Sequence, residues 1–276
     1  MKKHLILLFL LSLFSLTGLF FTLSVQADSY ATMIGFNVTD ENFTKVKWLD
    51  TDYIEVFGQT NDGVKKYGTA MVDIGYYRYT AADEPSGYDF YSVLVRVIMD
   101  PEVHTYACGL FNWFTCTDQA YSERLEIYSD LQAYSSGANN TLVQATPETI
   151  NEGTVYSVGA GVTYSNGQLQ YAISGSVQFT ENRLDVRGTS DFYNSIYESV
   201  YQYNYSGSIF VSMNYLKDPS TQRGVYLIKV PEGQTWVSNK LWITSAFSMF
   251  ANIGGGGSMR IISLEEQDYY SGDICV

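Results

Sequence analysis

The chain has 276 residues and a formal net charge of −13 at pH 7, from 29 acidic and 16 basic residues. This balance disfavours a nucleic-acid partner, because proteins bind the phosphate backbone with basic surfaces. Aromatic residues make up 16% of the chain, with 24 tyrosines against five prolines. Runs of β-branched and aromatic residues recur between short clusters of Gly, Asn, Asp and Ser. These features predict an all-β fold.

Residues 1–27 have the pattern of a secretory signal peptide. Lysines at positions 2 and 3 precede an apolar run from Leu5 to about Leu23, and Ala27 completes a small-x-small cleavage site. No other window has the length and uniformity of a membrane-spanning helix. We therefore expect a secreted protein in which residues 28–276, 249 residues (276 minus 27), form a single β-rich domain.

Strands are predicted wherever β-formers recur between turn residues. Ahead of residue 150 the candidates are Thr32–Val38, Tyr53–Phe57, Tyr67–Tyr79, Tyr88–Met99 and Arg124–Tyr134. Beyond residue 190 they are Ser199–Tyr205, Ser208–Tyr215, Val225–Val230, Leu241–Phe250 and Met259–Leu264. The stretch from Val93 to Met99 is apolar on both faces apart from Arg96, which predicts a central strand. Ser206-Gly207 indicates a tight hairpin turn.

Three cysteines remain after the signal, at positions 108, 116 and 275. In an exported protein Cys108 and Cys116 can close a short disulfide loop, which leaves Cys275 unpaired. This loop contains Phe111, Trp113 and Phe114. One interpretation packs the rings into the core. The other presents them outward as a membrane or receptor contact, because aromatic rings favour the bilayer interface.

The sequence offers little catalytic chemistry. His104 is the only histidine after the signal, which excludes a multi-histidine metal site and leaves one candidate for a histidine base. A structural role for His104 is favoured. Glu265 and Glu266 are the kind of carboxylate pair that a glycosidase needs, but on so acidic a chain they are not distinguished from a solvated surface. We predict a protein that is not an enzyme and has no cofactor or metal.

Residues 154–180 alternate with the two-residue period of β-strands, and Asn166-Gly167 favours a type I′ turn between two arms. One face is mainly apolar and holds Tyr156, Val158, Ala160, Val162, Tyr164, Leu169, Tyr171, Ile173, Val177 and Phe179. The other is small or polar and holds Ser157, Gly159, Gly161, Thr163, Ser165, Gln168, Gln170, Ser174, Ser176 and Gln178. A two-residue turn pairs Tyr164 with Leu169 and Val162 with Tyr171, which places both apolar rows on one face.

The polar face of this hairpin carries no charge. No Asp, Glu, Lys or Arg occurs from Gly153 to Thr180, where the overall composition would give roughly four or five. An apolar face towards lipid and a neutral polar face towards water is the pattern of transmembrane β-strands, and about ten residues per arm span the apolar band of a barrel. A half-buried hairpin on a soluble sandwich uses the same alternation. That alternative does not explain the glycines inside the strands or the missing charges.

Two segments resemble a known family. Val155-Tyr-Ser-Val-Gly-Ala-Gly-Val-Thr-Tyr164 with its return strand, and Leu184-Asp-Val-Arg-Gly-Thr-Ser-Asp191, resemble the stem region of the leukocidin and hemolysin family of small β-barrel pore-forming toxins. The resemblance covers about residues 122–205. It implies a β-sandwich whose glycine-rich, amphipathic prestem hairpin becomes part of an oligomeric transmembrane β-barrel. The chain is short after the stem, so the membrane-binding rim is expected to be reduced or rebuilt.

The expected function is that of a secreted pore-forming cytolysin. Its partners would be a target-cell membrane or surface receptor and further protomers, identical or of a second kind, in a ring. The apolar row of the hairpin would face lipid and the polar row the lumen. The alternative is a secreted β-sandwich module that binds a glycan or another cell-surface ligand through exposed tyrosines and tryptophans. A hydrolase with a carboxylate pair is the third hypothesis.

Overall fold

The computed structural model describes residues 45–78, 87–132, 140–146, 161–165, 168–172, 184–189, 191–203, 217–234, 236–252, 259–271 and 274–275. The predicted signal peptide, the strands Thr32–Val38 and Ser208–Tyr215 and the turn Ser206-Gly207 lie outside these residues. No helix within the described ranges is long and apolar enough to cross a membrane.

Antiparallel strands make up the described chain, as the composition predicted. They are β1 (Lys45–Thr60), β2 (Gly63–Arg78), β3 (Tyr88–Pro101), β4 (Val103–Cys108), β5 (Phe114–Asp130), β6 (Thr141–Thr146), β7 (Gly161–Ser165), β8 (Gln168–Ala172), β9 (Leu184–Gly188), β10 (Ile196–Tyr203), β11 (Ser220–Pro231), β12 (Trp236–Val237), β13 (Lys240–Asn252), β14 (Met259–Ser271) and β15 (Ile274–Cys275). A short 3₁₀ turn, η2 (Leu110–Asn112), joins β4 to β5.

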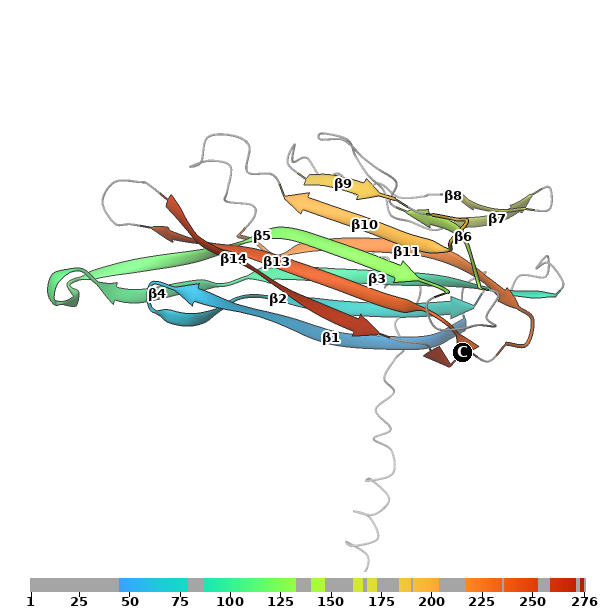
Figure 1. Ribbon diagram of the computed structural model, residues 1–276, viewed down its shortest axis with the longest axis horizontal. Helices are drawn as coiled ribbons and strands as arrows, with labels where there is room; N and C mark the ends of the chain where they lie inside the picture. Colours follow the sequence, from blue (N-terminus) through green and yellow to red (C-terminus); the bar gives the residue numbers. More distant parts are fainter. Residues whose placement is uncertain are drawn as a thin grey trace, which may run out of the picture.

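Two sheets form a sandwich whose long strands run along the longest axis of the molecule (Figure 1). The first sheet has the order β1-β2-β3-β11-β6. The second has the order β14-β13-β5-β10-β9, and β4 pairs with the beginning of β5. The pairs β12-β15 and β7-β8 form two small separate sheets.

Strand alternation builds the core between the two sheets. In β10, Tyr197, Ser199, Tyr201 and Tyr203 are buried, and the residues between them are half-exposed. The buried side chains of β2, β3 and β11 in the first sheet and of β5, β10 and β13 in the second belong to one hydrophobic cluster. Burying one face of each strand is what removes apolar area from water and stabilises a two-layer fold.

The strand predicted to be central is central. β3 lies between β2 and β11, and its side chains from Phe90 to Val95 are all buried. Its one charged residue within the apolar run, Arg96, is opposite Asp73 of β2, and the guanidinium Nη2 lies 2.7 Å from Asp73 Oδ2. The pairing offsets the cost of placing an arginine in this run.

Close approach between the sheets requires two glycines. A Cβ on Gly224 would lie 2.3 Å from the Tyr197 hydroxyl oxygen, and a Cβ on Gly68 would lie 2.6 Å from the Phe247 ring. The Tyr197 ring also stacks on Tyr226, with ring centroids 4.7 Å apart. The tyrosine-rich core is therefore packed too closely for any side chain at positions 68 and 224.

Buried polar groups in the core are hydrogen-bonded across the layers. Asn239 Nδ2 donates to the Tyr226 hydroxyl at 2.9 Å and to the Tyr76 hydroxyl, and Ser129 Oγ donates to Asn239 Oδ1 at 2.5 Å. Burial raises the pKa of Tyr226 to about 12, so this hydroxyl stays protonated at physiological pH. Asn239 thus connects β2 and β11 of the first sheet with β5 of the second.

Sequence periodicity placed some strands wrongly. The strands β4, β6, β9, β12 and β15 were not predicted, and β5 spans Phe114–Asp130 where Arg124–Tyr134 was expected. The physical reason is that β4 and the first part of β5 extend beyond the main core. Neither face of these segments is buried, so their sequences need not alternate between apolar and polar residues. β6 is a six-residue edge strand in which Leu142 and Val143 are adjacent, so its sequence does not alternate strictly between apolar and polar residues.

The strand directions define two ends of the sandwich. β3 ends at Pro101, and the chain continues into β4 and returns in β5, so we call this the tip end. In Figure 1 the β4-β5 hairpin projects at the left, beyond the turn between β1 and β2. The beginning of β13 and the end of β14 lie at the opposite end, because Lys240 pairs with Asp130 and Ser271 with Leu241.

Candidate functional site

Three exposed aromatic side chains occupy the turn at the tip end. Phe111, Trp113 and Phe114 are 76%, 79% and 67% exposed, and the rings of Phe111 and Trp113 lie 5.8 Å apart. We call these three residues the aromatic tip. The interpretation that packed these rings into the core is wrong, because β4 and β5 carry the turn past the end of the sandwich. Exposed aromatic rings on a projecting turn suit contact with the interface of a bilayer.

The turn holds an unusual backbone conformation. Gly109, Phe111 and Asn112 have φ values of 80°, 63° and 58°. Glycine adopts such angles freely, but a bulky residue such as Phe111 rarely does. The Asn112 N–H donates to the Gly109 carbonyl at 3.2 Å and closes the turn. Backbone strain of this kind concentrates at functional positions, where it sets the direction of side chains.

A disulfide closes the base of the turn. Cys108 is bonded to Cys116, which confirms the predicted pairing. Cys108 is the last residue of β4, and Cys116 is a residue of β5 that pairs with Tyr106 of β4. The crosslink joins residues eight apart in the sequence and so limits the freedom of the whole aromatic tip.

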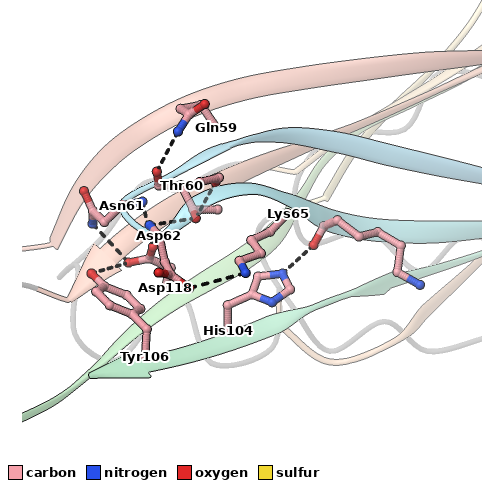
Figure 2. A network of polar contacts seen from close by, with 10 residues as sticks. Gln59, Thr60, Asn61, Asp62, Lys65, His104, Tyr106 and Asp118 are labelled. Atoms are coloured by element: carbon pink, nitrogen blue, oxygen red, sulfur yellow. Dashed lines mark hydrogen bonds and ion pairs between the residues drawn. The ribbon is translucent and has the colours of Figure 1, made fainter. Parts of the chain in front are cut away.

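The turn between β1 and β2 supports the β4-β5 hairpin from the side (Figure 2). Asp118 of β5 is fully buried and accepts hydrogen bonds from the Asn61 backbone N–H at 3.1 Å, from Asn61 Nδ2 at 3.2 Å and from the Tyr106 hydroxyl at 3.3 Å. Thr60 Oγ donates to the Gly63 carbonyl at 2.8 Å and accepts from the Asp62 N–H, which shapes the turn. One carboxylate therefore fixes the hairpin to the sandwich.

Three neighbouring residues attach the start of β4 to β2. His104 Nε2 lies 2.5 Å from the Lys66 carbonyl oxygen, so this nitrogen carries the proton and donates. Lys66 Nζ in turn lies 3.1 Å from Glu102 Oε1, and the hydrogen bond that the ammonium group donates to this carboxylate raises the pKa of Lys66. These contacts agree with the structural role predicted for His104.

The parts of the two predicted hairpin arms that lie next to the turn pair as expected. β7 and β8 are antiparallel, with Val162 opposite Tyr171 and Tyr164 opposite Leu169, in the register obtained from the alternation of the sequence. Both strands pair only with each other within the described ranges. The remaining predicted stem positions lie outside the described residues: Tyr156, Ser157, Val158, Gly159, Ala160, Asn166, Gly167, Ile173, Ser174, Ser176, Val177, Gln178 and Phe179.

The strands on either side of this hairpin, β6 and β9, each have one end that faces the aromatic tip, whereas β7 and β8 themselves lie near the opposite end of the sandwich (Figure 1). β6 is antiparallel to β11, with Thr141 opposite Lys229 and Thr146 opposite Val225, so it runs towards the tip end. β9 begins at Leu184, opposite Tyr203, at the end of β10 that lies towards the tip end. Residues 147–183 therefore connect the end of β6 to the beginning of β9, and both of these strand ends face the aromatic tip.

The predicted carboxylate pair does not converge. Glu265 and Glu266 are successive residues of β14, and successive side chains of a strand project to opposite faces. Glu265 lies against Gly58 of β1, where an added Cβ would be 2.4 Å from the Glu265 Cγ atom. Glu266 is exposed to solvent. Among the residues that the structure describes, no group of three or more His, Cys, Asp or Glu side chains is arranged to hold a metal ion.

Sequence reasoning missed the polar residues that hold the aromatic tip. Asp118, Asn61 and Tyr106 are brought together from three strands or turns that are up to 57 residues apart in the sequence. No local pattern identifies such a contact. The only available signal was an acidic residue two positions after Cys116 in an otherwise neutral stretch.

No protein-family model matches the chain, and no curated protein sequence matches it. Among solved structures, the fold is similar to those of pore-forming proteins. Clostridium perfringens delta-toxin is 14% identical with a TM-score of 0.47, over 83% of this chain and 89% of the toxin. A pore-forming protein is 9% identical with a TM-score of 0.45, over 81% and 89%. The membrane-inserted form of the Clostridium perfringens NetB toxin is 7% identical with a TM-score of 0.41, over 83% and 97%.

Two of these three structures are named as toxins, and the other is named as a pore-forming protein. At such identities and TM-scores the likeness assigns no role to any residue of this chain. Roles for the aromatic tip and the hairpin must come from their own geometry and chemistry.

Proposed function

We propose that this protein is a secreted pore-forming cytolysin that contacts a target membrane with its aromatic tip and inserts one β-hairpin per protomer. The observation that carries the proposal is the hairpin of residues 154–180. It has a charge-free polar face, an apolar face and the register Val162 opposite Tyr171, and the strands at its base, β6 and β9, open towards the end that bears the aromatic tip.

The physics of the bilayer requires several protomers. A lone hairpin has two outer edges whose backbone N–H and C=O groups would lack partners in hydrocarbon, and each such group costs several kcal/mol. Closing a barrel from several hairpins removes every edge. The protomers are copies of this chain, or copies of this chain with a second component.

The two faces of the hairpin receive different environments in such a barrel. The row that contains Val162, Tyr164, Leu169 and Tyr171 faces lipid, and the row that contains Thr163 and Gln170 faces water. The glycines in the strands weaken a fixed sheet, which favours a segment that must leave one packing and pair again with neighbours.

Dye release from liposomes tests this function directly. Purified mature protein should release an encapsulated dye, and negative-stain images of the same membranes should show rings. A protein that binds liposomes or cells but releases no dye from any membrane tested, and forms no rings, would instead be a secreted binding module.

Trp113→Ala is expected to weaken binding to liposomes severalfold and to leave the melting temperature nearly unchanged. The side chain is 79% exposed, so its loss removes an interfacial contact without opening a cavity in the core. Co-sedimentation with liposomes and a thermal melt measure the two effects. A large fall in melting temperature, or unchanged binding, would contradict a membrane role for this ring.

The pore is expected to prefer cations. Glu152 and Glu181 stand just outside the stem in the sequence and Asp185 belongs to β9, so we expect these carboxylates near one mouth of a pore whose lining is neutral. Rings of carboxylates attract cations in a channel. Reversal potentials across planar bilayers with a salt gradient measure this preference. A preference for anions would contradict the placement of these three residues at the mouth of the pore.

A further inference from the structure

Three aromatic side chains form a row across the outer face of the second sheet. Trp242 of β13 pairs directly with Tyr270 of β14 on one side and with Tyr128 of β5 on the other. The ring centroids lie 5.7 Å and 5.2 Å apart, and the rings of each pair are tilted by 52°. We call these three residues the aromatic row. It lies at the end of the sandwich opposite the aromatic tip.

The aromatic row is open to solvent. Tyr270 is 46% exposed, and Trp242 and Tyr128 are partly exposed, while their neighbours Leu241 and Ile127 point into the core. Cross-strand aromatic pairs stabilise a sheet, which accounts for two rings in contact. It does not account for the polar groups that surround the row.

Hydrogen-bonding groups flank the aromatic row on each side. At one side Lys240 Nζ lies 3.9 Å from the centroid of the Trp242 ring, and Asp130 is the cross-strand neighbour of Lys240. At the other side Thr244 Oγ donates to Asp268 at 2.6 Å. Glu198 of β10 continues the row beyond Tyr128. The apolar ring faces therefore lie between carboxylates, a hydroxyl and an ammonium group.

The charge of these flanks excludes two kinds of occupant. Three carboxylates, Asp130, Glu198 and Asp268, outnumber the one ammonium group of Lys240, so an anionic lipid surface would be repelled. The centre of a protein–protein interface is depleted of charged residues, which disfavours a second copy of this chain. The row suits a ligand that is uncharged, has an apolar ring face and carries hydroxyls at its edge.

We propose that the aromatic row binds a neutral oligosaccharide. The C–H faces of sugar rings stack on the aromatic rings, and the distance between neighbouring rings is comparable with the length of one sugar residue. The carboxylates accept hydrogen bonds from sugar hydroxyls. The flexible Lys240 side chain moves aside towards Asp130 and exposes the face of Trp242. Because the row is remote from the aromatic tip, glycan binding does not depend on insertion of the hairpin.

Binding of the purified mature protein to immobilised neutral and sialylated oligosaccharides, without lipid, tests this site. We expect binding to at least one neutral oligosaccharide, and about tenfold weaker binding for Trp242→Ala, because a lost aromatic stacking contact is of this order. Tyr270→Ala, at an exposed position on an edge strand, should also weaken binding.

The matched control is Trp236→Ala. This tryptophan lies on β12, outside the aromatic row, and is 57% exposed, so its loss should leave glycan binding unchanged. Thermal melts identify any variant that fails to fold, and Tyr270→Ala then decides. Binding of no glycan, binding of sialylated glycans alone, or an equal loss for Trp236→Ala and Trp242→Ala would overturn the proposal. The lipid-free assay separates these outcomes from a failure to form pores.

Discussion

Val162→Lys is expected to abolish membrane permeabilisation. In the proposed barrel Val162 faces lipid near the middle of the bilayer, opposite Tyr171 in the observed register. A lysine on the lipid face at this depth costs about 2–4 kcal/mol per chain. Because each protomer of a ring carries the substitution, the cost is repeated in every hairpin of the barrel. Dye release should fall to the background at protein concentrations that saturate the wild type.

Thr163→Lys is the matched control, one residue further along β7. Successive residues of a strand face opposite sides, so this lysine meets water in the lumen. The variant should still form pores, with a lower conductance for cations. Melts of both soluble monomers separate a membrane effect from damage to the fold. Equal loss of permeabilisation in both variants, with both monomers intact, would refute the assignment of residues 154–180 as a stem.

Asp118→Ala is expected to lower the free energy of unfolding by about 3 kcal/mol, because the buried carboxylate accepts three hydrogen bonds whose donors would lose their partner. The variant should also bind membranes more weakly than wild type at temperatures where it remains folded, since the β4-β5 hairpin loses its attachment to the turn between β1 and β2. Urea unfolding and liposome co-sedimentation measure the two effects.

Asp62→Ala provides the comparison within the same turn. Asp62 is exposed and forms an ion pair with half-exposed Lys65 at 3.3 Å, a contact that contributes little to stability. Its unfolding free energy should change by less than about 1 kcal/mol. If Asp118→Ala and Asp62→Ala unfold alike, the Asp118 contacts do not hold the hairpin.

The sequence was sufficient for those features that depend on neighbouring residues. Two-residue alternation and the Asn166-Gly167 turn predicted the pairing of β7 with β8, because the register of a hairpin follows from turn length and parity. An apolar run placed β3 inside a sheet. Cysteine spacing predicted the bond between Cys108 and Cys116.

Features that depend on contacts between residues far apart in the chain could not be predicted from the sequence. The contact between Asn61 and Asp118 arises only when β1, β2 and the β4-β5 hairpin meet at one end of the sandwich. The direction of the rings at Phe111 and Trp113 could not be chosen either, since an apolar turn of this composition suits a core as well as a surface. The aromatic row requires three strands in register, and Tyr128 and Tyr270 are 142 residues apart (270 minus 128).

The edge positions of β6 and β9 have a consequence for how the molecule can change shape. Each is the last strand of its own sheet, and β7 and β8, the described strands between them, pair with neither sheet. Movement of β7 and β8 therefore breaks no strand pairing of either sheet, and the hydrogen bonds of β2, β3, β5 and β13 can stay intact throughout. In the proposed insertion, the interior of the sandwich and the hairpin would therefore behave as separate cooperative units. Amide hydrogens in the interior strands would keep their slow exchange while the hairpin leaves one environment for another.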